Sequence, residues 1–159
     1  IDPHIWTSPR ALKQMAANAY DALRTSFPDS VRYTENYEKL LVRLDSLDTA
    51  CAEALRQANV HTIVIYHPAL TYYAADYGLE QLAVEHDGKE PSARHLARLI
   101  EEARRKKVRR VFYQAQYPAS TVKVIAEDIG ARSVKIDPLR EDVIGNIGEI
   151  TRQLTSGNE

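Results

Sequence analysis

The chain has 159 residues, 44% of them hydrophobic, which is enough for one domain with a buried core. Lysine and arginine (21) nearly balance aspartate and glutamate (22), so the net charge of −1 predicts no attraction to nucleic acid or to an anionic membrane surface. Cys51 is the single cysteine, which excludes an intrachain disulfide and an all-cysteine metal site. No apolar run approaches the roughly 20 residues of a membrane-spanning helix. Because the first residue is Ile1, we expect a mature or excised part of a longer protein.

The N-terminal part predicts two long helices after a short irregular segment. Residues 2–9 (DPHIWTSP) are too rich in proline for regular structure, and Ser8 followed by Pro9 is typical of a helix start. Apolar residues at spacings of three and four then predict a helix to about Ser26. A second helix is predicted from about Ser30 to Ala58, with a length of about 40 Å at roughly 1.5 Å per residue.

From Val60 onward, strands and helices alternate. Strands are predicted at 60–66, 80–85, 109–115 and 131–136, and helices at 69–77, 92–107, 119–129 and 141–154. Short connections between alternating elements favour a parallel sheet with helices on both faces. The predicted fold class is therefore α/β, with a parallel four-stranded sheet preceded by two long helices.

Polar side chains follow each predicted strand. They are His67 after the first strand, Glu85 and His86 after the second, Gln114 and Gln116 after the third, and Asp137 after the fourth. The carboxyl ends of parallel strands meet at one edge of a sheet, where ligands bind. Taken singly, each residue also has an ordinary explanation. His67 is then a hydrogen-bonded loop histidine, and Asp137 before Pro138 is a turn residue.

Two kinds of chemistry remain open for these residues. The sequence contains no glycine-rich phosphate loop, no G-x-S-x-G motif and no H-E-x-x-H motif. His4 and His67, each next to a proline, could combine with carboxylates to bind a borderline metal such as zinc or manganese. The alternative is a small α/β enzyme with His67 as general base and Glu85 or Asp137 as its partner. That enzyme would need a nucleophile or a cofactor loop, and the sequence shows neither.

Four sequence blocks, in order, resemble the zinc- and manganese-binding solute-binding proteins of ABC importers. Residues 2–9 resemble the D-P-H-x-W-x-S-P signature of that family. Residues 66–79 (YHPALTYYAADYGL) are similar to its H-x-a-x-x-Y-x-x-x-x-y-G-L segment. Residues 90–93 (EPSA) resemble its E-P-S block, and residues 111–117 (VFYQAQY) its V-F-x-E-x-Q-F block. The blocks extend over most of the chain and match the zinc-type members, known as cluster A-I.

The resemblance implies a set of metal ligands. It implies that His4 is a ligand from the edge of an N-terminal lobe and His67 a ligand from the C-terminal lobe. A histidine at the position of His67 goes with zinc, whereas manganese binders place glutamate there, so zinc is the expected metal and manganese the second choice. Asp137 resembles the aspartate that is the fourth ligand in some members. Gln114 departs from the family, which has glutamate at that position.

The resemblance also implies an architecture and partners. Residues 1–29 would be the motif loop and the helix that links two lobes, 30–155 the C-terminal lobe, and 156–159 a flexible tail. The implied protein is not an enzyme, works outside the cytoplasm in the periplasm or on a lipid anchor, and delivers metal to the membrane permease subunits of the importer. Since another ligand would come from an N-terminal lobe that precedes this chain, we expect the chain alone to bind zinc much more weakly than the whole protein.

Overall fold

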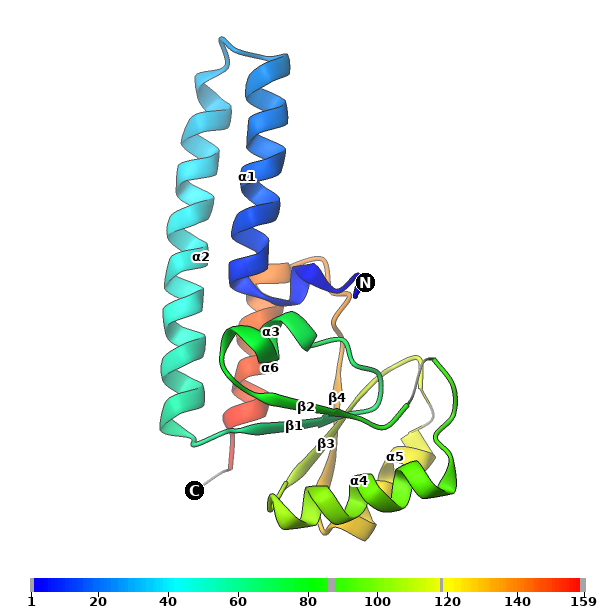
Figure 1. Cartoon of the computed structure of the whole chain (residues 1–159). Coiled ribbons are helices and arrows are strands. Elements are labelled where there is room, and N and C mark those ends of the chain that lie inside the picture. The colour runs from blue at the N-terminus through cyan, green and yellow to red at the C-terminus, as the bar shows by residue number, and fades with distance from the viewer. Residues whose placement is uncertain (1, 86–87, 118, 158–159) are drawn as a thin grey trace.

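The computed structural model describes residues 2–85, 88–117 and 119–157. His86 and the last two residues of the predicted tail, 158–159, lie outside this part of the chain. A helical hairpin projects from an α/β unit (Figure 1). None of the helices in the described ranges is both long and apolar enough to cross a membrane.

The two predicted N-terminal helices are confirmed, and they form the hairpin. After a short 3-10 turn, η1 (Ile5–Thr7), helix α1 (Pro9–Ser26) runs antiparallel to helix α2 (Val31–Gln57) (Figure 1). The rings of Tyr20 and Tyr37 stack between them, with centroids 4.3 Å apart. The predicted boundary at 29 and 30 falls in the turn of this hairpin, and the division into a linker and a lobe stays a prediction.

The four predicted strands are also confirmed, and they pair in parallel. Strands β1 (Thr62–Ile65), β2 (Glu80–Ala83), β3 (Arg110–Gln114) and β4 (Arg132–Ile136) lie in the order β2-β1-β3-β4. The β-branched residues of β1 place this strand at an inner position of the sheet, where both of its faces are covered. The fold class predicted from the alternation of elements is thus correct.

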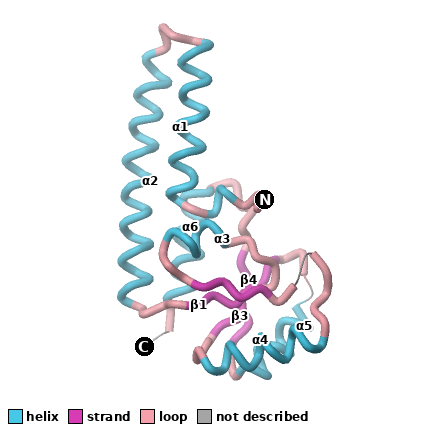
Figure 2. The backbone as a smooth tube through the Cα atoms, viewed as in Figure 1, coloured by secondary structure: helices cyan, strands magenta, loops and turns pink. Residues whose placement is uncertain are grey.

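Helices cover both faces of the sheet, and each face has its own core. The helices after the hairpin are α3 (Thr71–Asp76), α4 (Ala93–Arg105), α5 (Ala119–Ile129) and α6 (Val143–Thr155). On one face α2, α3 and α6 pack around Ile63 and Ile65, and on the other α4 and α5 pack around Val64 and Val111. Figure 2 shows the strands between these two helical layers. This arrangement directs the carboxyl ends of the strands toward the N-terminal segment.

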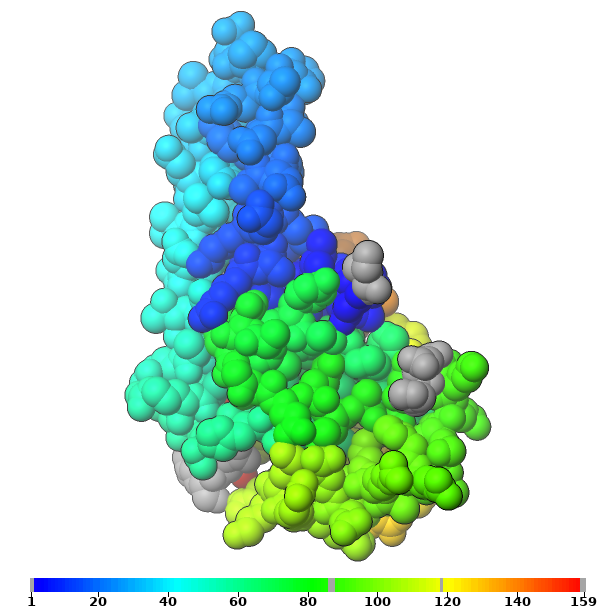
Figure 3. Space-filling model, in the orientation of Figure 1, coloured from blue at the N-terminus to red at the C-terminus, as the bar shows by residue number. Residues whose placement is uncertain are grey.

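Ser8 joins helix α1 to helix α3. Its hydroxyl oxygen is buried and accepts hydrogen bonds from the N–H groups of Arg10 (3.1 Å) and Ala11 (3.2 Å), while the hydroxyl donates to the carboxylate of Asp76. The Arg10 side chain donates to the main-chain oxygen of Asp76 at 2.7 Å. In the space-filling view the N-terminal segment lies directly against the segment that contains α3 (Figure 3). Ser8 and Pro9 of the first sequence block therefore start helix α1, and Ser8 also joins the start of this helix to α3.

Replacing Ser8 by alanine is expected to lower the free energy of unfolding by about 1–2 kcal/mol, because an N-cap and a hydrogen bond to a carboxylate are lost together. Urea unfolding followed by circular dichroism measures the change. The control is Thr25→Ala, which removes an exposed hydroxyl from the last turn of the same helix and should change the free energy by less than about 0.5 kcal/mol. Equal effects of the two substitutions would contradict the assigned role of Ser8.

Candidate metal centre

Two histidines from distant parts of the sequence meet at the carboxyl edge of the sheet. His4 precedes η1, and His67 lies two residues beyond the end of β1. Their Nε2 atoms are 3.3 Å apart, and the two rings meet edge to face with centroids 5.0 Å apart. Two nitrogen ligands of a tetrahedral zinc ion, each about 2.0–2.1 Å from the metal, are themselves about 3.3 Å apart. The pair thus has the spacing of two vertices of a zinc tetrahedron.

Each imidazole is bound to a carboxylate through its other ring nitrogen. Nδ1 of His67 lies 2.7 Å from Oε1 of Glu85, and Nδ1 of His4 lies 2.6 Å from Oδ1 of Asp2. An ionised carboxylate only accepts hydrogen bonds, so in both pairs Nδ1 carries the proton and donates it. Nε2 is then the nitrogen that can bind a metal, and in both rings it is the one directed at the other histidine.

Asp137, the third predicted ligand, does not join the histidines in this structure. Its side chain is exposed and accepts a hydrogen bond from the N–H of Leu139 at 3.1 Å, which is the turn geometry expected of aspartate before proline. Across residues 2–85, 88–117 and 119–157, no group of three or more His, Cys, Asp or Glu side chains is placed to hold a metal ion. The role of Asp137 as a ligand stays a prediction.

The tryptophan of the first block connects the two loops beside the histidines. Nε1 of Trp6 donates to the main-chain oxygen of Pro138 at 2.9 Å, across 132 residues of sequence. The same loop after β4 is held from the other side, because the Asn146 side chain donates to the main-chain oxygen of Asp137 at 2.8 Å. The loop that carries His4 is therefore fixed against the sheet edge by Trp6.

Gln114 holds the main chain of His67 from the neighbouring strand. It is the last residue of β3, it is 3% exposed, and its Nε2 donates to the main-chain oxygen of His67 at 2.8 Å. Its Oε1 accepts from the N–H of His67 at 3.4 Å. The sequence placed Gln114 at the end of the third predicted strand, near the ligand-binding edge, and identified it as a departure from a family glutamate, but it did not predict this contact with His67. An amide can satisfy both main-chain groups because it donates and accepts.

We expect Gln114→Leu to weaken zinc binding by about tenfold, which is the lower end of the range for residues that orient a metal ligand. Leucine keeps the size of the side chain but leaves the main-chain N–H and C=O of His67 without these partners. Calorimetric titration with zinc measures the loss. Gln14→Leu on the exposed side of α1 is the control, and its affinity should equal that of the unchanged chain. If the two variants bind zinc equally well, Gln114 does not orient the site.

A cavity of about 200 Å³ opens beside the two histidines. Its other lining residues are Ala69, Gln114, Gln116, Tyr117, Pro138 and Leu139. The lining therefore combines both predicted histidines with the loops that follow β1, β3 and β4. The structure places the cavity at the edge that the sequence predicted for ligand binding.

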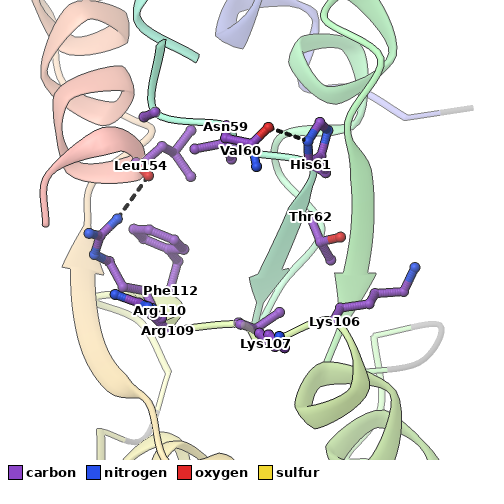
Figure 4. Close-up of a pocket in the computed structure, with 12 residues that line it drawn as sticks. Asn59, Val60, His61, Thr62, Lys106, Lys107, Arg109, Arg110, Phe112 and Leu154 are labelled. Atoms are coloured by element: carbon purple, nitrogen blue, oxygen red, sulfur yellow. Dashed lines mark hydrogen bonds between the residues drawn. The ribbon is translucent and has the colours of Figure 1, made fainter. Parts of the chain in front are cut away.

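A second pocket, of about 300 Å³, lies at the opposite edge, where the strands begin (Figure 4). Its lining includes four cationic residues, Lys106, Lys107, Arg109 and Arg110, and one histidine, His61. Lys106 extends away from the pocket, and Arg110 donates to the main-chain oxygen of Leu154 at 2.8 Å (Figure 4). Cationic side chains and a single imidazole are a poor donor set for a divalent metal.

The contact between His67 and Glu85 also bears on the enzyme alternative, because a general base needs a carboxylate partner of this kind. In a general base, however, the free nitrogen faces the proton that it removes from a substrate. Here Nε2 of His67 faces a second imidazole nitrogen instead. This arrangement favours metal binding.

The chain thus combines a parallel α/β unit with a pair of imidazoles at the spacing of zinc ligands. Residues 1–155 match the profile of the family described as zinc-uptake complex component A, periplasmic (ZnuA), and the chain belongs to this family. This confirms the resemblance seen in the four sequence blocks.

Curated relatives match most of this chain, which in turn covers only a part of each. The zinc-binding lipoprotein AdcA of Streptococcus pneumoniae R6 is 31% identical over 142 residues, which are 87% of this chain and 28% of that protein. The high-affinity zinc uptake system protein ZnuA of Bacillus subtilis is 27% identical over 142 residues, or 87% of this chain and 44% of that protein. The chain thus spans less than half the length of these two relatives.

Solved structures show the same fold. A crystal structure of ZnuA superposes with a TM-score of 0.92 at 31% identity, and the match covers 100% of this chain and 63% of that one. A ZnuA deletion mutant with zinc bound gives a TM-score of 0.91, also at 31% identity, over 100% of this chain and 62% of that one. The whole described fold therefore occurs in zinc-binding relatives.

Proposed function

We propose that this chain is a metal-holding part of an extracytoplasmic zinc-binding protein of an ABC importer, with His4 and His67 as two of the zinc ligands. The observation that carries the proposal is the 3.3 Å separation of the two Nε2 atoms. This distance matches two vertices of a zinc tetrahedron, and the bonds from Nδ1 of each ring to a carboxylate leave both Nε2 atoms available to a shared metal.

Zinc is the cargo in this proposal, so the protein binds and releases it without chemistry. The rings of His4 and His67 supply neutral nitrogen donors, and the carboxylates of Asp2 and Glu85 offset the charge of the incoming cation. A protein site for zinc usually has four ligands, so the remaining ones come from elsewhere. Asp137 is the candidate in this chain, and an N-terminal lobe is the expected source of another histidine.

The names of the relatives support zinc rather than manganese and a place outside the cytoplasm. AdcA is described as a zinc-binding lipoprotein, and the matching family as a periplasmic zinc-uptake component. The partners that follow from this role are the permease subunits of the importer. Manganese is the second choice of metal.

Zinc titration by calorimetry tests the proposal on this chain and on the longer protein that contains it. With two ligands instead of four, we expect the chain to bind at least about 10,000-fold more weakly, because structural zinc sites gain roughly 3 kcal/mol or more per ligand. Tight, stoichiometric binding by the chain alone would contradict the shared site. Asp137→Asn tests the third ligand, and unchanged affinity in the longer protein would remove it from the ligand set.

A further inference from the structure

Glu85 is the more buried of the two carboxylates that bind the histidines, and it is not in the predicted ligand set. Its side chain is 6% exposed, although β2 ends two residues earlier. The main chain continues along β1 beyond that end, because the N–H of Glu85 donates to the oxygen of Tyr66 at 3.0 Å. This extension places the carboxylate next to His67, 18 residues away in sequence, with a contact of 2.7 Å to Nδ1.

Tyr117 completes the surroundings of Glu85. Its ring stacks on the imidazole of His67, with centroids 5.5 Å apart and an interplanar angle of 18°. Burial, the charge of Glu85 and a hydrogen bond to Glu85 raise the pKa of the Tyr117 hydroxyl. The phenol therefore stays protonated beside the carboxylate. Glu85 and Tyr117 thus both contact the imidazole of His67, Glu85 at Nδ1 and Tyr117 on the ring face.

We propose that Glu85 is a positioning residue that keeps His67 in the Nδ1–H tautomer and so presents Nε2 to zinc. The inference rests on the proposed function, in which His67 is a ligand, and it adds the group that sets the orientation and protonation of that ligand. A carboxylate that accepts from Nδ1 also increases the electron density on Nε2, which strengthens its bond to a metal.

Three features favour a positioning role over an ordinary buried ion pair. The carboxylate binds the one ring nitrogen that does not face His4, so the bond selects a tautomer that leaves the metal-facing nitrogen free. The stacked Tyr117 ring limits rotation of the imidazole. Burying a carboxylate costs free energy unless it is paired, and the bond to His67 supplies the partner of Glu85.

Asp2 makes the equivalent bond to His4, but Asp2 is more exposed than Glu85 and its oxygen is shared with a second donor. Its side chain is 22% exposed, and the oxygen that binds Nδ1 of His4 also accepts from the main-chain N–H of His4 at 2.8 Å. Such a contact over two residues is a common turn geometry and occurs without a metal. Substitution of Glu85 is therefore the better test of whether a carboxylate positions its histidine.

The experiment compares Glu85→Ala, Glu85→Gln and Tyr117→Phe with the surface control Glu101→Gln. Long-range ¹H–¹⁵N spectra of the zinc-free protein report the His67 tautomer, and calorimetry reports zinc affinity. We expect Glu85→Ala to mix the two tautomers of His67 and weaken zinc binding by about 10- to 100-fold. Glu85→Gln should keep the Nδ1–H tautomer, because its amide oxygen accepts the same hydrogen bond, and recover part of the affinity. Tyr117→Phe keeps the stacked ring and should show a smaller loss.

An unchanged tautomer together with unchanged affinity in Glu85→Ala would overturn the positioning role. A merely structural role would lower thermal stability in all Glu85 and Tyr117 variants without changing the tautomer, and this outcome too would overturn it. The proposed function is judged separately by His67→Ala. If that variant binds zinc as before, His67 is not a ligand, and the spectra alone then decide whether Glu85 sets its tautomer.

Discussion

Replacing His67 by alanine is expected to weaken zinc binding by this chain by about 100-fold, because structural zinc sites gain roughly 3 kcal/mol or more per ligand. His4 would remain as an isolated imidazole with a partner oxygen from Asp2. Calorimetric titration with zinc measures the change. At the affinity expected of a site with two ligands, such a loss leaves no measurable heat at ordinary protein concentrations.

The matched control for this substitution is His61→Ala. His61 lies at the opposite edge of the sheet, where its ring bonds to the Asn59 side chain at 2.9 Å (Figure 4). The control variant should bind zinc like the unchanged chain. If His61→Ala and His67→Ala lose the same affinity, the zinc bound by this chain is not held at the proposed centre.

Leu70→Ala is expected to lower the free energy of unfolding by about 3 kcal/mol, within the range for leucine in a closely packed core. Leu70 is fully buried at the start of α3, three residues after His67, and it belongs to the core that α2, α3 and α6 form on one face of the sheet. The substitution leaves a cavity under the loop that carries the histidine. Urea unfolding followed by circular dichroism provides the measurement.

Val42→Ala is the control for Leu70→Ala. Val42 lies on α2 with 66% of its surface exposed, so its loss should change the free energy of unfolding by less than about 0.5 kcal/mol. A change in Leu70→Ala as small as that in the control would show that α3 is not packed as described. A large loss of stability in Leu70→Ala with wild-type zinc affinity below the unfolding transition would separate core packing from the geometry of the site.

The cargo role and the enzyme alternative make different use of the same contacts. Both need His67 beside a carboxylate, and Glu85 meets that condition. Only a metal site also needs a second neutral nitrogen a few ångströms from the first, and His4 provides it. The pairing of two imidazoles, rather than the presence of either histidine, is thus the feature that favours zinc binding.

The order and type of the elements could be predicted from local patterns. Apolar spacings of three and four place α1 and α2 within one residue of their predicted ends, and the β-branched run from Thr62 to Ile65 marks β1. His4 and His67 stood out because each lies in a block with a recognisable order of residues. Both kinds of signal depend on neighbours close in sequence, and a single sequence contains these directly.

The contacts that make a site could be known only once the chain was folded. The positions of Glu85 beside His67 and of Gln114 across its main chain depend on β1 lying between β2 and β3. The side chain of Asp137 accepts a hydrogen bond within its own turn, and only the folded structure shows that it does not face the two histidines. Periodicity in the sequence therefore predicted the helices and the strands, and the resemblance of two sequence blocks to a known family identified the two histidines. Long-range packing decided strand order and side-chain direction, and through them the 3.3 Å approach of the two imidazole nitrogens.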